Sequence, residues 1–254
     1  MLKKLLKSII PSQLFWIPRY YLFHQRLSLR NHGIILDAGC GEGIVTEDLL
    51  KRKLKVVGVD ISLAQLRVAE SRCHRDIFVQ ADVGHLPFKD GIFDIVFSLD
   101  VLGNVKSIRD VFLEFHRVLK PEGILFISVR REYHSSCKLF VLQRAIRKIT
   151  PRFLYTRDLP NGMAWLDSTS EEEKERLGNI YSLAELEEKS RGLFRIIQQE
   201  YFMKMFTALA RDVVYGVKGF YYIRCILFFM VIRIERYFFK RMPGYCIFLE
   251  LMKI

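Results

Sequence analysis

The sequence predicts an α/β fold built on a mostly parallel sheet with helices on both faces. Four short apolar runs, at 34–36, 56–59, 93–98 and 124–129, alternate with stretches of helical periodicity. Strands buried on both faces are continuous apolar runs, and their alternation with helices indicates βαβ units. At 254 residues the chain is long enough for one domain with a full-sized core.

The first apolar run opens into a glycine-rich turn. Asp37 ends the run, and Gly39, Gly41 and Gly43 follow at alternate positions. Glycine tolerates positive φ and lets a ligand approach the bare main chain, so the turn indicates a nucleotide-type cofactor. A dinucleotide fingerprint needs its third glycine where this chain has Ile44. The spacing therefore argues against an NAD oxidoreductase.

Acidic residues follow the ends of several predicted strands. Asp37 and Asp60 end two of the apolar runs, Asp100 follows a third, and Asp82 lies in the loop between them. A helix N-cap or a solvated turn is the ordinary explanation for any one such acid. Parallel sheets bind ligands at the carboxyl ends of their strands. Four acids in register therefore indicate a ligand site at that edge.

In order and spacing these segments resemble the motifs of class I S-adenosylmethionine-dependent methyltransferases. The resemblance is carried by residues 34–43, 56–62, 80–88, 93–100 and 115–129. In style the motifs are similar to those of small-molecule members in ubiquinone and menaquinone biosynthesis. The resemblance implies a Rossmann-like sheet of seven strands with an antiparallel last strand, helical insertions, and S-adenosylmethionine as the cofactor.

The resemblance also implies which residues bind the cofactor. Asp60 is expected to accept both ribose hydroxyls, and Asp82 to accept the adenine amino group while its neighbours pack on the ring. The end of the strand at 93–98 is expected to face the methyl group. The predicted cofactor residues are Asp37, Gly39, Gly41, Gly43, Asp60, Ile61, Asp82, Val83 and Leu99.

Catalytic residues are harder to predict, because the cofactor is already an activated sulfonium. Such an enzyme chiefly aligns the acceptor and, where needed, accepts one proton. By analogy with the family, His134 and Asp100 are the best placed candidates for a base; the alternative for His134 is an ordinary loop histidine. His116 lies within a helical pattern and is expected to be a structural or solvent-facing residue. No metal site is expected.

The rest of the chain divides into a core and additions to it. A capping box at Ser182 and Glu185 predicts a helix to about Ser190. The predicted parts are an N-terminal basic amphipathic cap at 1–32, a core at 33–203 with a substrate insertion at about 130–181, a basic hydrophobic helical insertion at 204–243, and a closing strand at 244–254.

Positive charge is concentrated in two of these parts. The chain has 40 Lys and Arg against 28 Asp and Glu; residues 1–32 hold six bases and no acid, and 204–243 hold eight bases against two acids. Within 219–239 the longest uncharged stretch, 225–232, is far shorter than the roughly 20 residues of a membrane span. One interpretation is contact of 1–23 and 204–243 with an anionic membrane surface. The other is a cap over the site and a lid or dimer face.

These observations predict a methyltransferase that acts on a small or lipid-linked acceptor at a membrane surface. The alternatives are a soluble-metabolite methyltransferase with a hydrophobic lid or dimer face, and a non-catalytic scaffold subunit that binds the cofactor. Nucleic acid is disfavoured, because the Asn/Asp-Pro-Pro-Tyr signature of enzymes that methylate bases is absent at Ser98–Val101.

Cellular location is predicted from the cysteines and the N-terminus. Five scattered cysteines indicate a reducing compartment. Lys7 and Pro11 interrupt the apolar stretch that a signal peptide would need. We therefore expect a cytoplasmic protein, peripherally bound to the inner face of a membrane in the first interpretation of the charge. The acceptor and the oligomeric state stay open.

Overall fold

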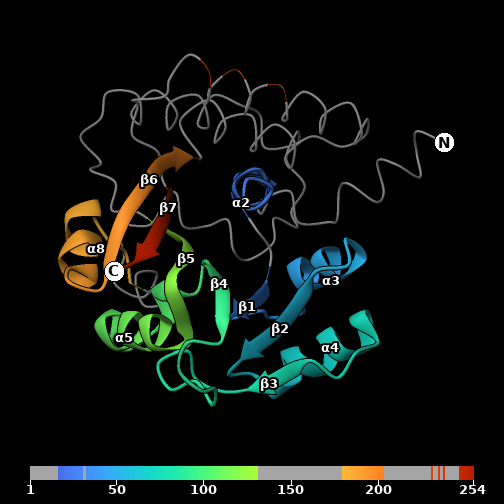
Figure 1. The fold of residues 1–254 in the computed structure, drawn as a ribbon. Helices are drawn as coiled ribbons and strands as arrows, with labels where there is room; N and C mark the ends of the chain where they lie inside the picture. The colour runs from blue at the N-terminus through green and yellow to red at the C-terminus, as the bar shows by residue number, and fades with distance from the viewer. Residues whose placement is uncertain are drawn as a thin grey trace, which may run out of the picture. The chain divides into compact units, whose positions relative to one another are not determined.

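The computed structural model describes residues 17–30, 33–130, 179–202 and 246–254, together with the single helical residues Met230, Ile234 and Tyr237 (Figure 1). The helices are α2 (Ile17–Leu27), α3 (Ile44–Lys51), α4 (Leu63–Cys73), η2 (Leu102–Asn104), α5 (Ile108–Val118) and α8 (Leu183–Ser190). The strands are β1 (Ile34–Ala38), β2 (Lys55–Asp60), β3 (Phe78–Gln80), β4 (Phe93–Leu99), β5 (Leu119–Arg130), β6 (Phe194–Phe202) and β7 (Cys246–Lys253).

The strands form one seven-stranded sheet in the order β3-β2-β1-β4-β5-β7-β6. The pairs from β3 to β5 are parallel, and β7 runs antiparallel to its neighbour β6 in Figure 1. The predicted Rossmann-like sheet is therefore confirmed. The strand order reverses between β1 and β4, where Asp37 pairs with Phe97 in the register. In such sheets ligands bind outside the strand ends at this reversal.

Helices cover both faces of the sheet, α3 and α4 on one side and α5 and α8 on the other (Figure 1). The sequence of α5 explains why this helix packs on the sheet. Its buried residues recur at helical spacing and so form one apolar face: Ile108, Val111, Phe112, Phe115 and Val118. Ser107 caps the start of the helix. Coverage on both sides buries nearly all of β1 and β4, which explains their continuous apolar sequences.

The helix α2 packs against the middle of the sheet. Its Phe23 is fully buried, with ring centroids 4.4 Å from Phe97 of β4 and 5.5 Å from Phe126 of β5. Just beyond the helix, Arg30 forms an ion pair with Glu250 of β7, a carboxylate that is only 2% exposed. This part of the chain therefore contributes to the core.

Of two local predictions, the structure confirms the capping box and corrects the start of β5. The capping box is confirmed, because the Ser182 hydroxyl accepts from the Glu185 amide and the Glu185 carboxylate accepts from the Ser182 amide. The strand β5 was predicted to begin at Ile124 but begins at Leu119. Its register on β4 jumps from Phe93–Leu119 to Ile95–Ile124, so the expected turn is an irregularity within the strand.

The chain divides into two compact units. The one that holds the sheet comprises Arg19–Arg131, Gly178–Glu200 and Ile247–Ile254. The other comprises Met1–Pro18, Glu132–Leu177 and Tyr201–Cys246, and most of it lies outside the described residues, as do nearly all of the predicted insertions. Among the described residues, no helix has the length and apolarity needed to cross a membrane.

Candidate cofactor site

The glycine turn after β1 is built as predicted. Gly39, Gly41 and Gly43 have φ of +86°, +52° and +69°, values that other residues adopt only at a cost. The amides of Gly39 and Cys40 both donate to the carbonyl oxygen of Val59, at 2.7 and 2.8 Å. These two hydrogen bonds fasten the turn to the end of β2.

The three glycines differ in what surrounds them. A Cβ at Gly39 would lie 2.3 Å from Cγ2 of Val101, and one at Gly43 would lie 2.8 Å from Cβ of Ala69, so protein atoms already fill those directions. A Cβ at Gly41 would meet nothing closer than Oε1 of Gln65 at 3.9 Å. Gly41 is therefore the position at which a ligand can come close to bare main chain.

The carboxylate of Asp60 lies beside Gly41 at the end of β2. Its Oδ2 accepts from the Gly41 amide at 2.8 Å, and its Oδ1 accepts from the Ser62 amide at 2.9 Å. A carboxylate can accept about four hydrogen bonds, so each oxygen keeps capacity for a further donor. The main chain thus orients Asp60 without using up its ability to bind a ligand with two neighbouring hydroxyls.

Asp37 lies beneath the turn rather than on its surface. It is 4% exposed, and its Oδ2 accepts from the Thr46 hydroxyl at 2.5 Å. Burial raises the pKa of Asp37 to about 7; the Thr46 hydrogen bond opposes this shift and the nearby Asp60 adds to it. Its described contacts tie the end of β1 to the start of α3.

Asp82 follows β3, next to the end of β2. Its side chain is exposed, and Oδ1 accepts from the Gly84 amide at 2.8 Å. The amide of Ala81 donates to the carbonyl oxygen of Asp60 at 3.1 Å, which holds the two strand ends together. Ile61 is 67% exposed and Val83 is buried. The structure therefore brings Asp60, Ile61 and Asp82 to one edge of the sheet, as predicted.

Asp100 follows β4 and has a different environment. Its φ of +66° is unusual for a residue with a side chain, and its amide donates to the carbonyl oxygen of Ser128 at 3.0 Å. Oδ2 lies 2.9 Å from NH1 of Arg19, and Oδ1 lies 3.6 Å from Nε of Arg130. The preceding Leu99 is buried at 7% exposure. Asp100 is thus a carboxylate between two guanidinium groups.

The two histidines considered as bases lie in different parts of the chain. His134 lies outside the described residues. His116 is on α5, where its ring packs edge-on against Phe194 at 5.7 Å and its Nε2 lies 3.4 Å from the carbonyl oxygen of Ile254. His116 is therefore half-buried, and these contacts favour the structural of its two expected roles.

Sequence reasoning missed Arg19 as part of this edge. Arg19 was counted among the bases of the N-terminal cap, but it is 1% exposed and pairs with Asp100. A signal was available: Arg19 precedes the buried Leu22 and Phe23 by three and four residues, which places it on the apolar face of α2. A base on the buried face of a helix needs an acidic partner.

Sequence comparison with known proteins finds methyltransferases. A family model described as a methyltransferase domain matches residues 36–127. A putative methyltransferase of Bacillus subtilis is 37% identical over 119 residues, which cover 44% of this chain and 47% of that protein. A ubiquinone biosynthesis O-methyltransferase of Erwinia tasmaniensis is 28% identical over 194 residues, covering 70% of this chain and 75% of that protein.

A solved structure shares the fold. The structure of Haemonchus contortus phosphoethanolamine N-methyltransferase 2 in complex with S-adenosyl-L-methionine superposes with a TM-score of 0.58, at 19% identity, over 92% of this chain and 52% of that chain. Matches to six curated relatives each span less than half of the relative's length. Residues 36–127 are therefore a methyltransferase domain, in a fold of the class I, Rossmann-like type of S-adenosylmethionine-dependent methyltransferases.

Proposed function

We propose that the chain is an S-adenosylmethionine-dependent methyltransferase that acts on a small or lipid-linked acceptor at a membrane surface. The observation that carries the cofactor assignment is the pairing of Gly41 with Asp60. Gly41 offers open main chain, and Asp60 is held 2.8 Å from its amide with acceptor capacity to spare. A nucleoside with a 2′,3′-diol fits that arrangement.

The other residues of the edge complete the proposed site. Asp60 accepts the ribose hydroxyls, Asp82 accepts the adenine amino group, and Ile61 packs on the base. When bound, S-adenosylmethionine supplies the methyl group already activated as a sulfonium. The chain then has to hold the cofactor, align the acceptor and exclude water.

Asp100 serves a positioning role in this proposal rather than that of a base. Its carboxylate is a negative partner of Arg19, a buried cation. The ion pair instead holds α2 at the end of β4, beside the position where the family places the methyl group. His134 stays the candidate for removal of a proton where the acceptor requires it.

The proposed acceptor class rests on the segment 204–243. Met230, Ile234 and Tyr237 are helical residues spaced four and three apart, and they are 52%, 50% and 74% exposed. Large exposed apolar residues at spacings of four and three, within a segment rich in Lys and Arg, are typical of sequences that lie in a membrane interface. A relative named for ubiquinone biosynthesis supports an amphiphilic acceptor.

One observation favours the soluble-metabolite alternative for the N-terminal part. Leu22, Phe23 and Leu27 of α2 are buried at 2% exposure or less. This supports a cap on the core for α2. For the residues before position 17, contact with a membrane stays a prediction.

Vesicle flotation tests the membrane proposal. At low salt the protein should float with vesicles that contain anionic lipid and release them at high salt, because basic residues supply part of the attraction. Ile234→Asp should weaken flotation severalfold, whereas Leu113→Asp, at a comparably exposed position on α5, should not. Protein that stays in the soluble fraction at low salt would contradict the membrane proposal.

Methyl transfer tests the acceptor. Incubation of membrane extracts with methyl-labelled S-adenosylmethionine should place label in the organic phase. Label in the aqueous phase alone would support the soluble-metabolite alternative. Cofactor binding without any transfer would support the scaffold alternative.

A further inference from the structure

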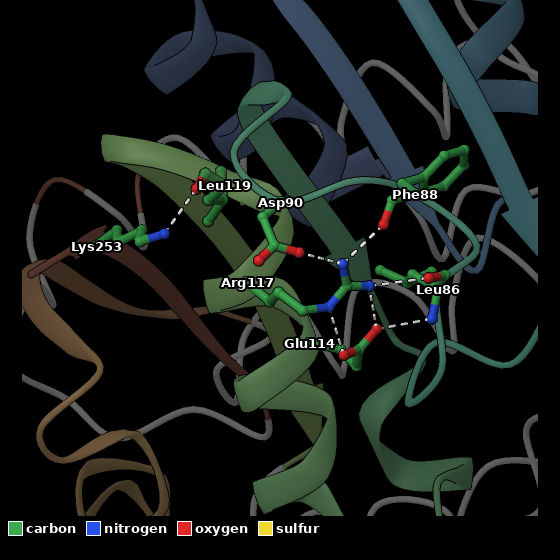
Figure 2. A network of polar contacts seen from close by, with 7 residues as sticks. All are labelled: Leu86, Phe88, Asp90, Glu114, Arg117, Leu119 and Lys253. Carbon is green, nitrogen blue, oxygen red and sulfur yellow. Dashed lines mark hydrogen bonds and ion pairs between the residues drawn. The ribbon is translucent and has the colours of Figure 1, made fainter.

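Arg117 of α5 is the centre of a polar network that holds the loop between β3 and β4 (Figure 2). NH2 donates to the carbonyl oxygen of Leu86 at 2.9 Å and NH1 to that of Phe88 at 2.7 Å. NH1 also donates to Asp90 at 2.7 Å, and Nε and NH2 donate to the two carboxylate oxygens of Glu114 at 2.8 and 2.7 Å. All three guanidinium nitrogens are used.

The network holds the loop by its main chain. Glu114 accepts from the Leu86 amide at 2.8 Å, so the amide and the carbonyl oxygen of Leu86 are both fixed to α5. The carbonyl oxygen of Arg117 in turn accepts from the Gly91 amide at 2.9 Å. The segment 86–91 is therefore fastened to the helix at both of its ends.

The same loop begins with the residues assigned to adenine. The amide of His85 donates to the carbonyl oxygen of Asp82 at 2.9 Å, so a short turn joins Asp82 to the fixed Leu86. Val83 and Leu86 are both buried, at 6% and 5% exposure. Where Asp82 lies thus depends on where the network holds Leu86.

We propose that Arg117 is a positioning residue that sets the selectivity of the cofactor site for adenine by fixing residues 82–88 through their main chain. The inference rests on the proposed function, which assigns Asp82 to the adenine amino group. The hydrogen bonds of Arg117 go to main-chain oxygens and to Asp90 and Glu114, so it acts on the cofactor through the loop.

A lysine cannot replace Arg117 in this network. The planar guanidinium has five donors in a fixed fork, which here reach two carbonyl oxygens and two carboxylates at once. A lysine ammonium keeps the charge but has three donors on one atom. Arg117→Lys therefore removes the geometry and leaves the electrostatics nearly unchanged.

Arg109 provides a matched control on the same helix. Its NH1 donates to the carbonyl oxygens of Lys189 and Arg191, at 2.6 and 3.2 Å, and so fastens the end of α8. Arg109→Lys makes the same chemical change and disturbs a different connection. A role in stability alone predicts similar behaviour for the two variants.

The test compares two cofactor analogues by calorimetric titration. S-adenosylhomocysteine carries the adenine amino group, and S-inosylhomocysteine has a carbonyl oxygen in its place. Wild type should prefer the adenosyl compound. Arg117→Lys should weaken binding of the adenosyl compound about tenfold and of the inosyl compound much less, as expected when one charge-assisted hydrogen bond to the base is lost. Arg109→Lys should leave both affinities within about twofold of wild type.

The outcomes separate this inference from the proposed function. A folded Arg117→Lys variant that keeps the wild-type preference would overturn the inference alone. Absence of binding by wild type, or equal affinity for both compounds, would overturn the cofactor site or its adenine loop, and the inference with it. If Arg117→Lys does not fold, Glu114→Gln and Asp90→Asn take its place, and loss of the preference is expected to be greater in Glu114→Gln, which also disturbs the Leu86 amide.

Discussion

The two halves of the ligand edge of the sheet hold their carboxylates in different ways. At the ends of β2 and β3, Asp60 and Asp82 accept hydrogen bonds from main-chain amides, those of Gly41, Ser62 and Gly84. At the end of β4, Asp100 faces the guanidinium groups of Arg19 and Arg130.

The two kinds of partner indicate two roles for these carboxylates, ligand binding in the first half and support of the fold in the second. Neutral amides orient a carboxylate and leave it able to accept further donors. Guanidinium groups use the charge of the carboxylate to join elements that are far apart in the sequence. Changes on the first half should therefore act on cofactor affinity, and changes on the second half should act on stability.

The largest loss of cofactor affinity is expected for Gly41→Val. The valine side chain would fill the open approach to the main chain, at a position whose φ of +52° already disfavours it. Affinity for S-adenosylmethionine should fall at least about a hundredfold by calorimetric titration. Gly192→Val is the control, because Gly192 has φ of +75° and open space around it but lies between α8 and β6. Equal affinities of the two variants would contradict the assignment of the turn.

Asp37→Asn should alter how stability depends on pH. Burial raises the folded pKa of Asp37 to about 7, so the unfolded chain loses this proton first and stability falls as pH rises from about 4 to 7. The asparagine does not titrate and can still accept from Thr46. The variant should therefore gain roughly 4 kcal/mol over wild type between these values and keep the gain above pH 7. Urea unfolding at several pH values measures it, and a difference that is the same at every pH would refute the explanation.

Asp100→Asn should destabilise the fold while cofactor affinity changes little. It leaves the 1% exposed Arg19 without the negative charge of Asp100, a loss of about 3 kcal/mol in the free energy of unfolding. Glu188→Gln removes the carboxylate of an exposed pair with Lys189 and should cost less than about 1 kcal/mol. If Asp100→Asn keeps the wild-type midpoint of urea unfolding but loses activity, Asp100 acts in catalysis. The division of the edge into a binding half and a structural half would then be wrong.

Asp60→Ala should weaken S-adenosylmethionine binding at least about tenfold. The substitution removes two hydrogen bonds between a carboxylate and ribose hydroxyls, each worth roughly 1.5 to 3 kcal/mol, partly offset by water. The midpoint of urea unfolding should shift little. A smaller loss of affinity would show that Asp60 is not the ribose ligand.

The first half of the edge could be predicted from the sequence because its geometry is local. A buried strand, an acid and three glycines at alternate positions determine the turn after β1, and the amides that hold Asp60 belong to Gly41 and Ser62. Continuous apolar runs likewise predicted the central strands, because parallel strands are buried on both faces.

The second half could not be predicted because its contacts are long-range. Nothing near Asp100 in the sequence indicates that Arg19 lies beside it, and net charge placed Arg19 with the surface bases. Arg117 was visible only as part of a family motif, since its partners Leu86 and Phe88 lie in a distant loop. The start of β5 was missed because Lys120 and Glu122 do not suggest a buried strand.

Calorimetric titration of the purified protein with S-adenosylmethionine, with NADH as the control, tests whether the edge around Gly41 and Asp60 binds the cofactor. We predict micromolar binding of S-adenosylmethionine and none of NADH, because Gly41 leaves open space beside the carboxylate of Asp60 while position 44 is an isoleucine. Failure to bind S-adenosylmethionine, or equal binding of NADH, would contradict the account.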